Sequence, residues 1–191
     1  MIPKNNFHHF LLPCFIIFVL IIIQLADDNI KQWLRYNREG IQNGEYWRLL
    51  TAHFIHLGWT HLTLNGLSLL LIWGLGTTVL AVLYGFAFIL LCSLGISLGL
   101  FLCSPEVIWY VGLSGVLHGL LAIIALQQIH VFQGVVLVLL LIAKLVWEQY
   151  WGALPVTGQL TGGAVIVTAH LYGAIMGFIS ELIRWLLITV R

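Results

Sequence analysis

The sequence predicts an all-α integral membrane protein in which six spanning helices form a compact bundle. Of the 191 residues, 61% are apolar and only 8% are charged, and the mean hydropathy is +1.03, whereas about a quarter of the residues of a soluble domain carry charge. Six apolar runs also approach the roughly 20 residues that a spanning helix needs. We therefore expect residues 1–191 to form a single membrane domain.

The predicted spans lie at about 10–26, 52–74, 79–103, 111–129, 131–150 and 164–188. The first run has the position of a signal peptide, but its apolar core is long, only Lys4 precedes it, and the IQLADD that follows is a poor small-x-small cleavage site. We expect it to remain as the first span.

The largest polar segment, residues 27–51, connects the first two spans. It mixes four basic and four acidic residues with Trp33, Tyr36, Tyr46 and Trp47. Since Trp and Tyr favour the membrane–water interface, we expect an interfacial loop. The second long connection, WGALPVTGQLTGG at 151–163, is rich in Gly and is expected to be a flexible loop that could cap a site at the start of the last span.

Charge and cysteine content limit the possible partners and cofactors. The net charge of +1 and the pI near 7.8 show no basic stripe, so nucleic acid is not an expected partner and the lipid bilayer is the expected solvent. No CxxC or His-paired metal spacing occurs, so neither a metal nor another cofactor is expected. Buried, unpaired thiols are expected at Cys14, Cys92 and Cys103.

Polar residues gather at one level of the predicted bundle. Spans two, four and six run in the same direction, so their amino-terminal ends lie in one leaflet. Polar groups within a membrane are costly and usually face the bundle interior or a watery cavity. The polar residues at these ends are His53, His56, His61 and Asn65 in span two, Ser114 and His118 in span four, and His170 in span six.

Small residues indicate that spans four and six touch. Gly115 and Gly119 form one GxxxG step on span four, and Ala169, Gly173 and Gly177 form a small-xxx-small ladder on span six. Such ladders let two helix backbones approach closely. Each ladder lies one residue from a reactive side chain, Ser114 or His170.

The side chains at this level fit nucleophilic catalysis. A serine hydroxyl becomes a nucleophile when a base within hydrogen-bond reach removes its proton, and neutral histidine is the usual base. The Ser114 backbone N–H and the His61 and Asn65 side chains, one helical turn apart, are candidate oxyanion donors.

Two histidines are candidate bases. His118 stands four residues after Ser114 on the same helix face, so geometry alone does not exclude it, whereas His170 would approach from across the helix interface.

A third, acidic member of the site is not expected. Glu106 is the only acid near span four, and Glu148 and Glu181 fall near helix ends. Lys144 and Glu148, four residues apart, are expected to form an intrahelical pair in which the lysine snorkels. A Ser–His dyad is the predicted site.

The motifs together resemble the rhomboid intramembrane serine proteases. They are WR at Trp47 and Arg48, HLGWTHLTLN from His56 to Asn65, GLSG around Ser114 and AHLYGAIMG around His170. The resemblance covers spans two to six in order.

The resemblance implies a hydrolase with Ser114 as nucleophile, His170 as general base, and His61 and Asn65 as oxyanion donors, supported by Gly112, His118 and His56. It also implies a multi-pass protein of the bacterial inner membrane with a cytoplasmic amino terminus and an active site toward the periplasm. Lys and Arg counts alone do not orient the chain, because Lys31, Arg35, Arg38 and Arg48 oppose Lys4, Arg184 and Arg191.

Within the family, the six-span form and the segment GLSGVLHG look most like the rhombosortase branch. Members of that branch remove carboxy-terminal anchors made of a Gly-Gly motif, a hydrophobic helix and a basic tail. The implied partners are membrane-anchored protein substrates, and the oligomeric state stays open. The chain departs from the common rhomboid pattern at His118, where many members carry a tyrosine.

Other functions remain as alternatives. They are a rhomboid protease with other single-span substrates, an inactive relative that binds membrane proteins, and a transporter or channel, which would lack the inverted repeat of many transporters. A zinc site at His53 and His56 is disfavoured because HFIH lacks the Glu of HExxH, so an interfacial or structural role is expected for both.

Overall fold

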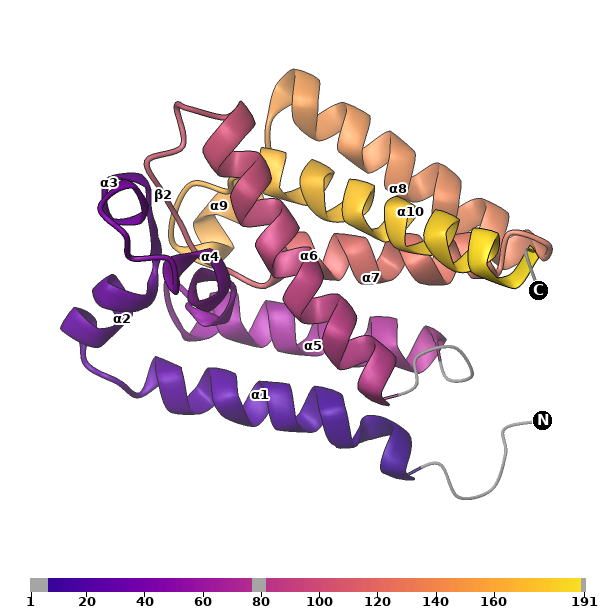
Figure 1. The fold of residues 1–191 in the computed structure, drawn as a ribbon, viewed down its shortest axis with the longest axis horizontal. Coiled ribbons are helices and arrows are strands. Elements are labelled where there is room, and N and C mark those ends of the chain that lie inside the picture. The colour runs from indigo at the N-terminus through magenta and orange to yellow at the C-terminus, as the bar shows by residue number, and fades with distance from the viewer. Residues whose placement is uncertain (1–6, 77–81, 190–191) are drawn as a thin grey trace.

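The fold is described from a computed structural model, which covers residues 7–76 and 82–189. Within this part the long helices are α1 (Leu11–Gln24), α5 (Trp59–Leu75), α6 (Val82–Cys103), α7 (Ser114–Gln127), α8 (Phe132–Trp151) and α10 (Val167–Thr189). Figure 1 shows that α5, α7 and α10 run in the same direction, as predicted. Residues 79–81 of the predicted third span lie outside the described residues, as do Lys4 and Arg191.

The second predicted span begins later than expected. Residues 52–58 do not belong to its helix: α4 (Arg48–Thr51) and the 3-10 helix η2 (Ala52–Phe54) precede a bend of 92°, after which α5 starts at Trp59. His53 is buried and shares a 3.0 Å hydrogen bond with the Ser97 hydroxyl of α6. The bend therefore places this polar side chain against protein instead of lipid.

The predicted interfacial loop at 27–51 is largely short helices, α2 (Asp28–Leu34), α3 (Arg38–Gln42) and α4, with the strand β1 (Tyr36–Asn37) between them. Side chains cap the amino-terminal ends of α2 and α3. Asp27 accepts hydrogen bonds from the backbone N–H groups of Asn29 and Ile30, and Asn37 accepts one from the N–H of Gly40. These are ordinary helix caps. Strand β1 pairs antiparallel with β2 (Trp109–Tyr110), so this segment is joined to the chain just before Ser114.

Arg38 fixes the end of α6. Its guanidinium donates hydrogen bonds of 2.6 to 3.2 Å to the carbonyl groups of Leu100, Phe101, Ser104 and Val107. The last carbonyls of a helix have no partner within the helix, and a positive charge is favourable there. Arg38 thereby holds the turn between α6 and β2.

The segment 151–163 was expected to be a loop throughout, but part of it is helical. It contains α9 (Pro155–Thr161). Pro155 occupies the first turn, where its missing N–H costs nothing, and Gly162 ends the helix with a left-handed φ of 81°.

Helices α7 and α10 form the centre of the bundle, packed through the predicted glycine ladders. A Cβ atom added to Gly119 would lie 2.7 Å from the carbonyl oxygen of Gly173, and one added to Gly115 would lie 2.8 Å from that of Ala169. These distances leave no room for a side chain. The predicted contact between spans four and six is confirmed.

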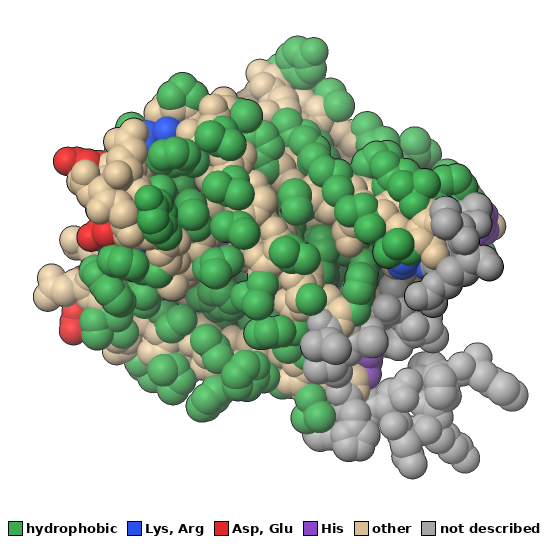
Figure 2. All heavy atoms as spheres, viewed as in Figure 1, with side chains coloured by type: hydrophobic (Ala, Val, Ile, Leu, Met, Phe, Trp, Pro, Cys, Tyr) green, Lys and Arg blue, Asp and Glu red, His purple; other side chains and the backbone are tan. Residues whose placement is uncertain are grey.

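The outer surface is apolar. Hydrophobic side chains cover most of the face seen in Figure 2, and acidic side chains gather at the end where α2 and α3 lie. Of the described helices, α8 and residues Tyr84–Cys103 of α6 are by themselves long and apolar enough to cross a membrane; α4 and η2 joined with α5 give a third candidate. Helices α1 and α7 are apolar but shorter.

The cysteine prediction holds for one residue only. Cys92 is buried and unpaired, whereas Cys14 and Cys103 are unpaired but exposed on the apolar surface. Cys14 lies within α1, where lipid can supply the apolar environment, whereas Cys103 is the last residue of α6.

Candidate active site

Ser114 and His170 meet at the interface of α7 and α10. Ser114 is the first residue of α7, and His170 lies in the first turn of α10. The His170 Nε2 atom is 3.0 Å from the Ser114 Oγ atom. The glycine ladders bring the two backbones close enough for this contact, so side chains 56 positions apart share a hydrogen bond.

The pair borders a cavity of about 940 Å³. Its walls are mainly apolar and come from α5, α7, α8, α9 and α10 and from the segments before α7 and α10. Leu154, Thr157 and Thr161 place the predicted capping segment 151–163 at the cavity. Ser114, His170, His61 and Asn65 all line it. A polypeptide segment bound in this cavity would therefore lie against the Ser114 hydroxyl.

His61 faces the chain just before the serine. Its Nδ1 atom accepts a 3.4 Å hydrogen bond from the backbone N–H of Leu57, so the proton resides on Nε2. A Cβ atom added to Gly112 would lie 3.1 Å from this Nε2. Gly112 has a φ of +118°, which favours glycine. The Nε2–H donor thus points toward the backbone beside Ser114.

Asn65 lies one turn after His61 and is buried. Its amide donates a 3.1 Å hydrogen bond to the backbone carbonyl of His61 within α5. An amide nitrogen carries two protons, so one remains for a group in the cavity. The backbone N–H of Ser114 is also available, because the first N–H groups of a helix lack partners within the helix.

Tyr110 fixes the position of Gly112. Its hydroxyl donates a 2.6 Å hydrogen bond to the carbonyl oxygen of Gly112. Burial raises the pKa of the Tyr110 phenol, which keeps it protonated and able to donate. The sequence-based prediction of the site did not include Tyr110; its position two residues before Gly112 was the available signal.

His118 stacks on His170. The two ring centroids are 4.1 Å apart and the ring planes differ by 15°. His118 therefore packs beside His170, while its Nδ1 donates a 2.7 Å hydrogen bond to the Ser114 backbone carbonyl. The histidine bonded to the Ser114 hydroxyl is His170.

Glu148 contradicts the expectation that no carboxylate belongs to the site. Its Oε2 atom is 2.9 Å from the His170 Nδ1 atom, and its Oε1 atom accepts a 2.6 Å hydrogen bond from Lys144. The predicted Lys144–Glu148 pair is therefore present, but it extends to His170. The missed signal was topological: α8 runs opposite to α7 and α10, so its carboxyl end reaches their amino ends.

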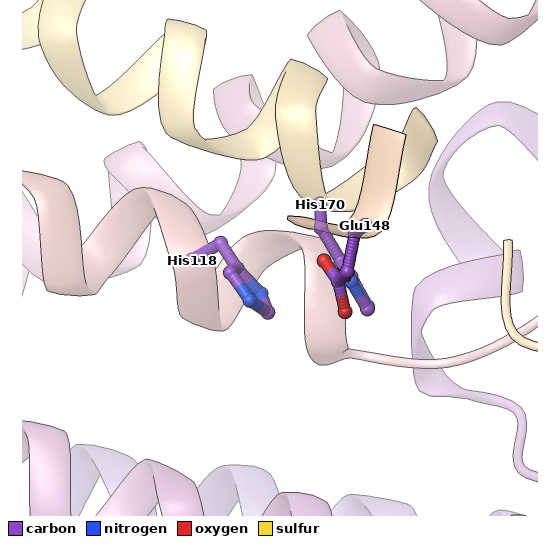
Figure 3. Close-up of side chains that lie close together, drawn as sticks. All are labelled: His118, Glu148 and His170. Carbon is purple, nitrogen blue, oxygen red and sulfur yellow. Dashed lines mark hydrogen bonds and ion pairs between the residues drawn. The ribbon is translucent and has the colours of Figure 1, made fainter. Parts of the chain in front are cut away.

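Figure 3 shows His118, Glu148 and His170 entering the same space from α7, α8 and α10. Their candidate ligand atoms lie within 4.8 Å of one another. A ring-nitrogen lone pair lies in the plane of its ring, however, and the two stacked rings lie in separate, nearly parallel planes, so their lone pairs do not converge on one ion. The arrangement suits proton transfer better than metal binding.

His53 and His56 are both buried, which favours the structural role over the interfacial one. The ring of His56 meets the ring of His61 edge-on with centroids 4.9 Å apart. His56 therefore packs against the His61 ring and supports it.

Comparison with known proteins shows which protein family the chain matches. Residues 43–187 match the family model described as "Rhomboid domain". The Bacillus subtilis (strain 168) protein named "Putative rhomboid protease YdcA" is 34% identical over 88 residues, which cover 44% of this chain and 42% of that protein. "Uncharacterized protein Rv1337" of Mycobacterium tuberculosis and "Uncharacterized protein Mb1372" of Mycobacterium bovis are each 28% identical over 175 residues, covering 85% of this chain and 69% of theirs. The match thus spans less than half of the first relative.

Proposed function

The chain belongs to the rhomboid family, and we propose that it is an intramembrane serine endopeptidase acting on membrane-anchored proteins. The observation that carries this proposal is the 3.0 Å contact between Ser114 Oγ and His170 Nε2 at the wall of a cavity inside an apolar helix bundle. A nucleophile and a base within hydrogen-bond reach are what acyl transfer requires.

In acylation, the Ser114 Oγ atom attacks the carbonyl carbon of the scissile peptide bond while its proton moves to His170 Nε2. The tetrahedral intermediate then collapses: the C–N bond breaks, and His170 returns the proton to the leaving amine. Water next attacks the acyl-enzyme with His170 again as base, which releases the carboxylate product and restores the serine.

The negative charge that develops on the carbonyl oxygen needs donors in the right place. We assign this role to the Ser114 backbone N–H, the His61 Nε2–H and the free N–H of Asn65. Their position around the cavity end of α7 supports the assignment.

The proposed membrane arrangement uses α1, α5, α6, α7, α8 and α10 as six spans of one domain covering residues 1–191. The proposed location is a bacterial inner membrane, with the site toward the periplasm. In support, Arg38 and Arg48 at the active-site end bond internally to carbonyl groups and to Glu45. These two cations therefore weigh little in a positive-inside count.

For the substrate, we propose a carboxy-terminal anchor with a Gly-Gly motif, a hydrophobic helix and a basic tail, as rhombosortases cleave. The sequence resemblance around GLSGVLHG supports this choice. A general rhomboid protease with other single-span substrates is the alternative.

Labelling with a serine-directed fluorophosphonate tests the activity. Membranes with the wild-type protein should be labelled, and Ser114→Ala should abolish the label. Absence of label on a folded wild-type protein would contradict the protease and favour an inactive binder or a transporter. A reporter ending in the Gly-Gly anchor, compared with one in which Val-Val replaces Gly-Gly, separates the two substrate classes: equal cleavage would leave the general protease.

A further inference from the structure

Glu148 contacts the catalytic pair from a third helix. Its side chain projects from the carboxyl end of α8 and is only 8% exposed, and the His170 side chain is 5% exposed. The 2.9 Å distance between Glu148 Oε2 and His170 Nδ1 is that of a charge-assisted hydrogen bond. Two hydrogen bonds that share the His170 ring therefore connect Ser114 to Glu148: Ser114 Oγ with His170 Nε2, and His170 Nδ1 with Glu148 Oε2.

This pair of hydrogen bonds fixes where the histidine carries its proton. A carboxylate only accepts hydrogen bonds, so His170 Nδ1 is the N–H that donates to Glu148. The Nε2 atom then holds a lone pair toward Ser114 Oγ, which is the tautomer that a general base needs. With the opposite tautomer, Nε2–H would face the serine hydroxyl and could not take its proton.

Lys144 stabilises the buried carboxylate of Glu148. Burying an unpaired charge is strongly unfavourable, whereas a paired and fully hydrogen-bonded one is tolerated. The Lys144 Nζ atom lies 2.6 Å from Glu148 Oε1, and its side chain is 47% exposed toward the cavity side of α8. Each carboxylate oxygen therefore has its own partner, and Glu148 stays ionised.

We propose that Glu148 is a positioning residue that completes a Ser114–His170–Glu148 relay, with Lys144 as its counter-charge. This inference rests on the proposed protease function. During acylation the Oγ proton moves to Nε2, and the imidazolium that forms keeps its Nδ1–H hydrogen-bonded to Glu148. Glu148 is not protonated in any step; it orients the ring and stabilises the positive charge.

The rival explanation is a purely structural ion pair within α8. Both explanations predict that large substitutions damage the fold, so the test needs small changes and a readout that packing does not move. Glu148→Gln keeps the size and removes the charge, and Glu148→Asp keeps the charge on a shorter side chain. Glu181→Gln is the matched control, because Glu181 is a buried glutamate in α10 that bonds to Arg184 and Gln127.

The experiment measures kcat and KM for cleavage of a single-span reporter by the full-length protein in proteoliposomes, with thermal unfolding of each variant measured in parallel. We expect Glu148→Gln to lower kcat on the order of 10²- to 10⁴-fold with little change in KM, as loss of the acidic member does in serine protease triads. Glu148→Asp should recover part of kcat, and Glu181→Gln should match the wild type.

A spectroscopic readout keeps the test independent of turnover. A hydrogen-bonded Nδ1–H of His170 should give a low-field proton signal that disappears in Glu148→Gln and in His170→Phe but persists in Ser114→Ala. A wild-type kcat in a folded Glu148→Gln variant, or an unchanged signal, would overturn the relay alone. If the wild type itself cleaves no reporter and takes no fluorophosphonate, the protease function fails instead.

Discussion

At the residue scale, Ser114 and His170 form the proposed nucleophile and base, and the two ring nitrogens of His170 face different partners. His170 meets Ser114 through Nε2 and Glu148 through Nδ1, while His118 stacks on its face. Contacts on three sides therefore fix the orientation of the His170 ring. The residues around it therefore differ in what their removal should change.

Removal of either member of the pair should abolish cleavage. We expect Ser114→Ala and His170→Ala each to reduce turnover to background, because the two side chains act as a unit. Cleavage of a single-span reporter checks this, with protease protection of the loops as the control for membrane insertion. Normal turnover by either variant would refute the assignment.

Loss of an oxyanion donor should act on kcat more than on KM. His61→Ala and Asn65→Ala remove donors that matter mainly in the transition state, and one such donor is worth about 10²-fold or more. Steady-state kinetics with the same reporter separate the two constants. A change confined to KM would mean that these residues bind substrate.

Cleavage activity should require His170 but not His118. His118→Phe and His118→Tyr keep a flat ring against His170 and should retain measurable activity, whereas His170→Phe should have none. The hydrogen bond of His118 goes to the Ser114 backbone carbonyl, so loss of the imidazole leaves the contact between Ser114 Oγ and His170 Nε2 in place. The reverse pattern of activities would transfer the base role to His118.

At the element scale, the glycine ladder sets how close α7 and α10 lie. A Cβ atom on Gly173 would collide with the backbone of Gly115. Gly173→Ala should therefore lower the unfolding free energy by about 1–3 kcal/mol through overpacking and reduce activity by separating Ser114 from His170. Thermal unfolding and reporter cleavage measure both effects.

Gly66→Ala provides the matched control for this prediction. Gly66 is also a glycine inside a helix, but the nearest side-chain atom to an added Cβ is 3.7 Å away, in Ile17. This substitution should leave stability and cleavage near the wild-type values. Equal damage from both substitutions would show that helical glycine itself, not the ladder, is required.

At the scale of the whole molecule, exposed thiols can report the orientation. Cys103 ends α6 near the active-site side and is exposed, while Cys92 is buried in the same helix. In spheroplasts, a membrane-impermeant maleimide should label Cys103 without lysis and should not label Cys92. A Cys103→Ser variant is the control, and labelling of Cys103 only after lysis would indicate the opposite orientation.

The sequence predicted the approximate positions of the long helices and the proximity of Ser114 and His170, because long apolar runs and local motifs carry that information. It was insufficient where a contact between distant segments decides the outcome. The bend before Trp59 follows from burying His53 against Ser97, and the role of Glu148 follows from the antiparallel course of α8. Helix α9 was missed although a proline start and a glycine end mark it.

Helix α7 has 14 residues, so its length is about 21 Å at 1.5 Å per residue, well short of a hydrocarbon core about 30 Å thick. Non-helical backbone at membrane depth is tolerated only where protein or a water-filled cavity satisfies it. The pairing of β1 with β2 and the Tyr110 hydrogen bond supply that satisfaction before Ser114. In the proposed membrane arrangement, the short α7 places Ser114 below the headgroups, and the proposed deacylation would depend on hydration at that depth.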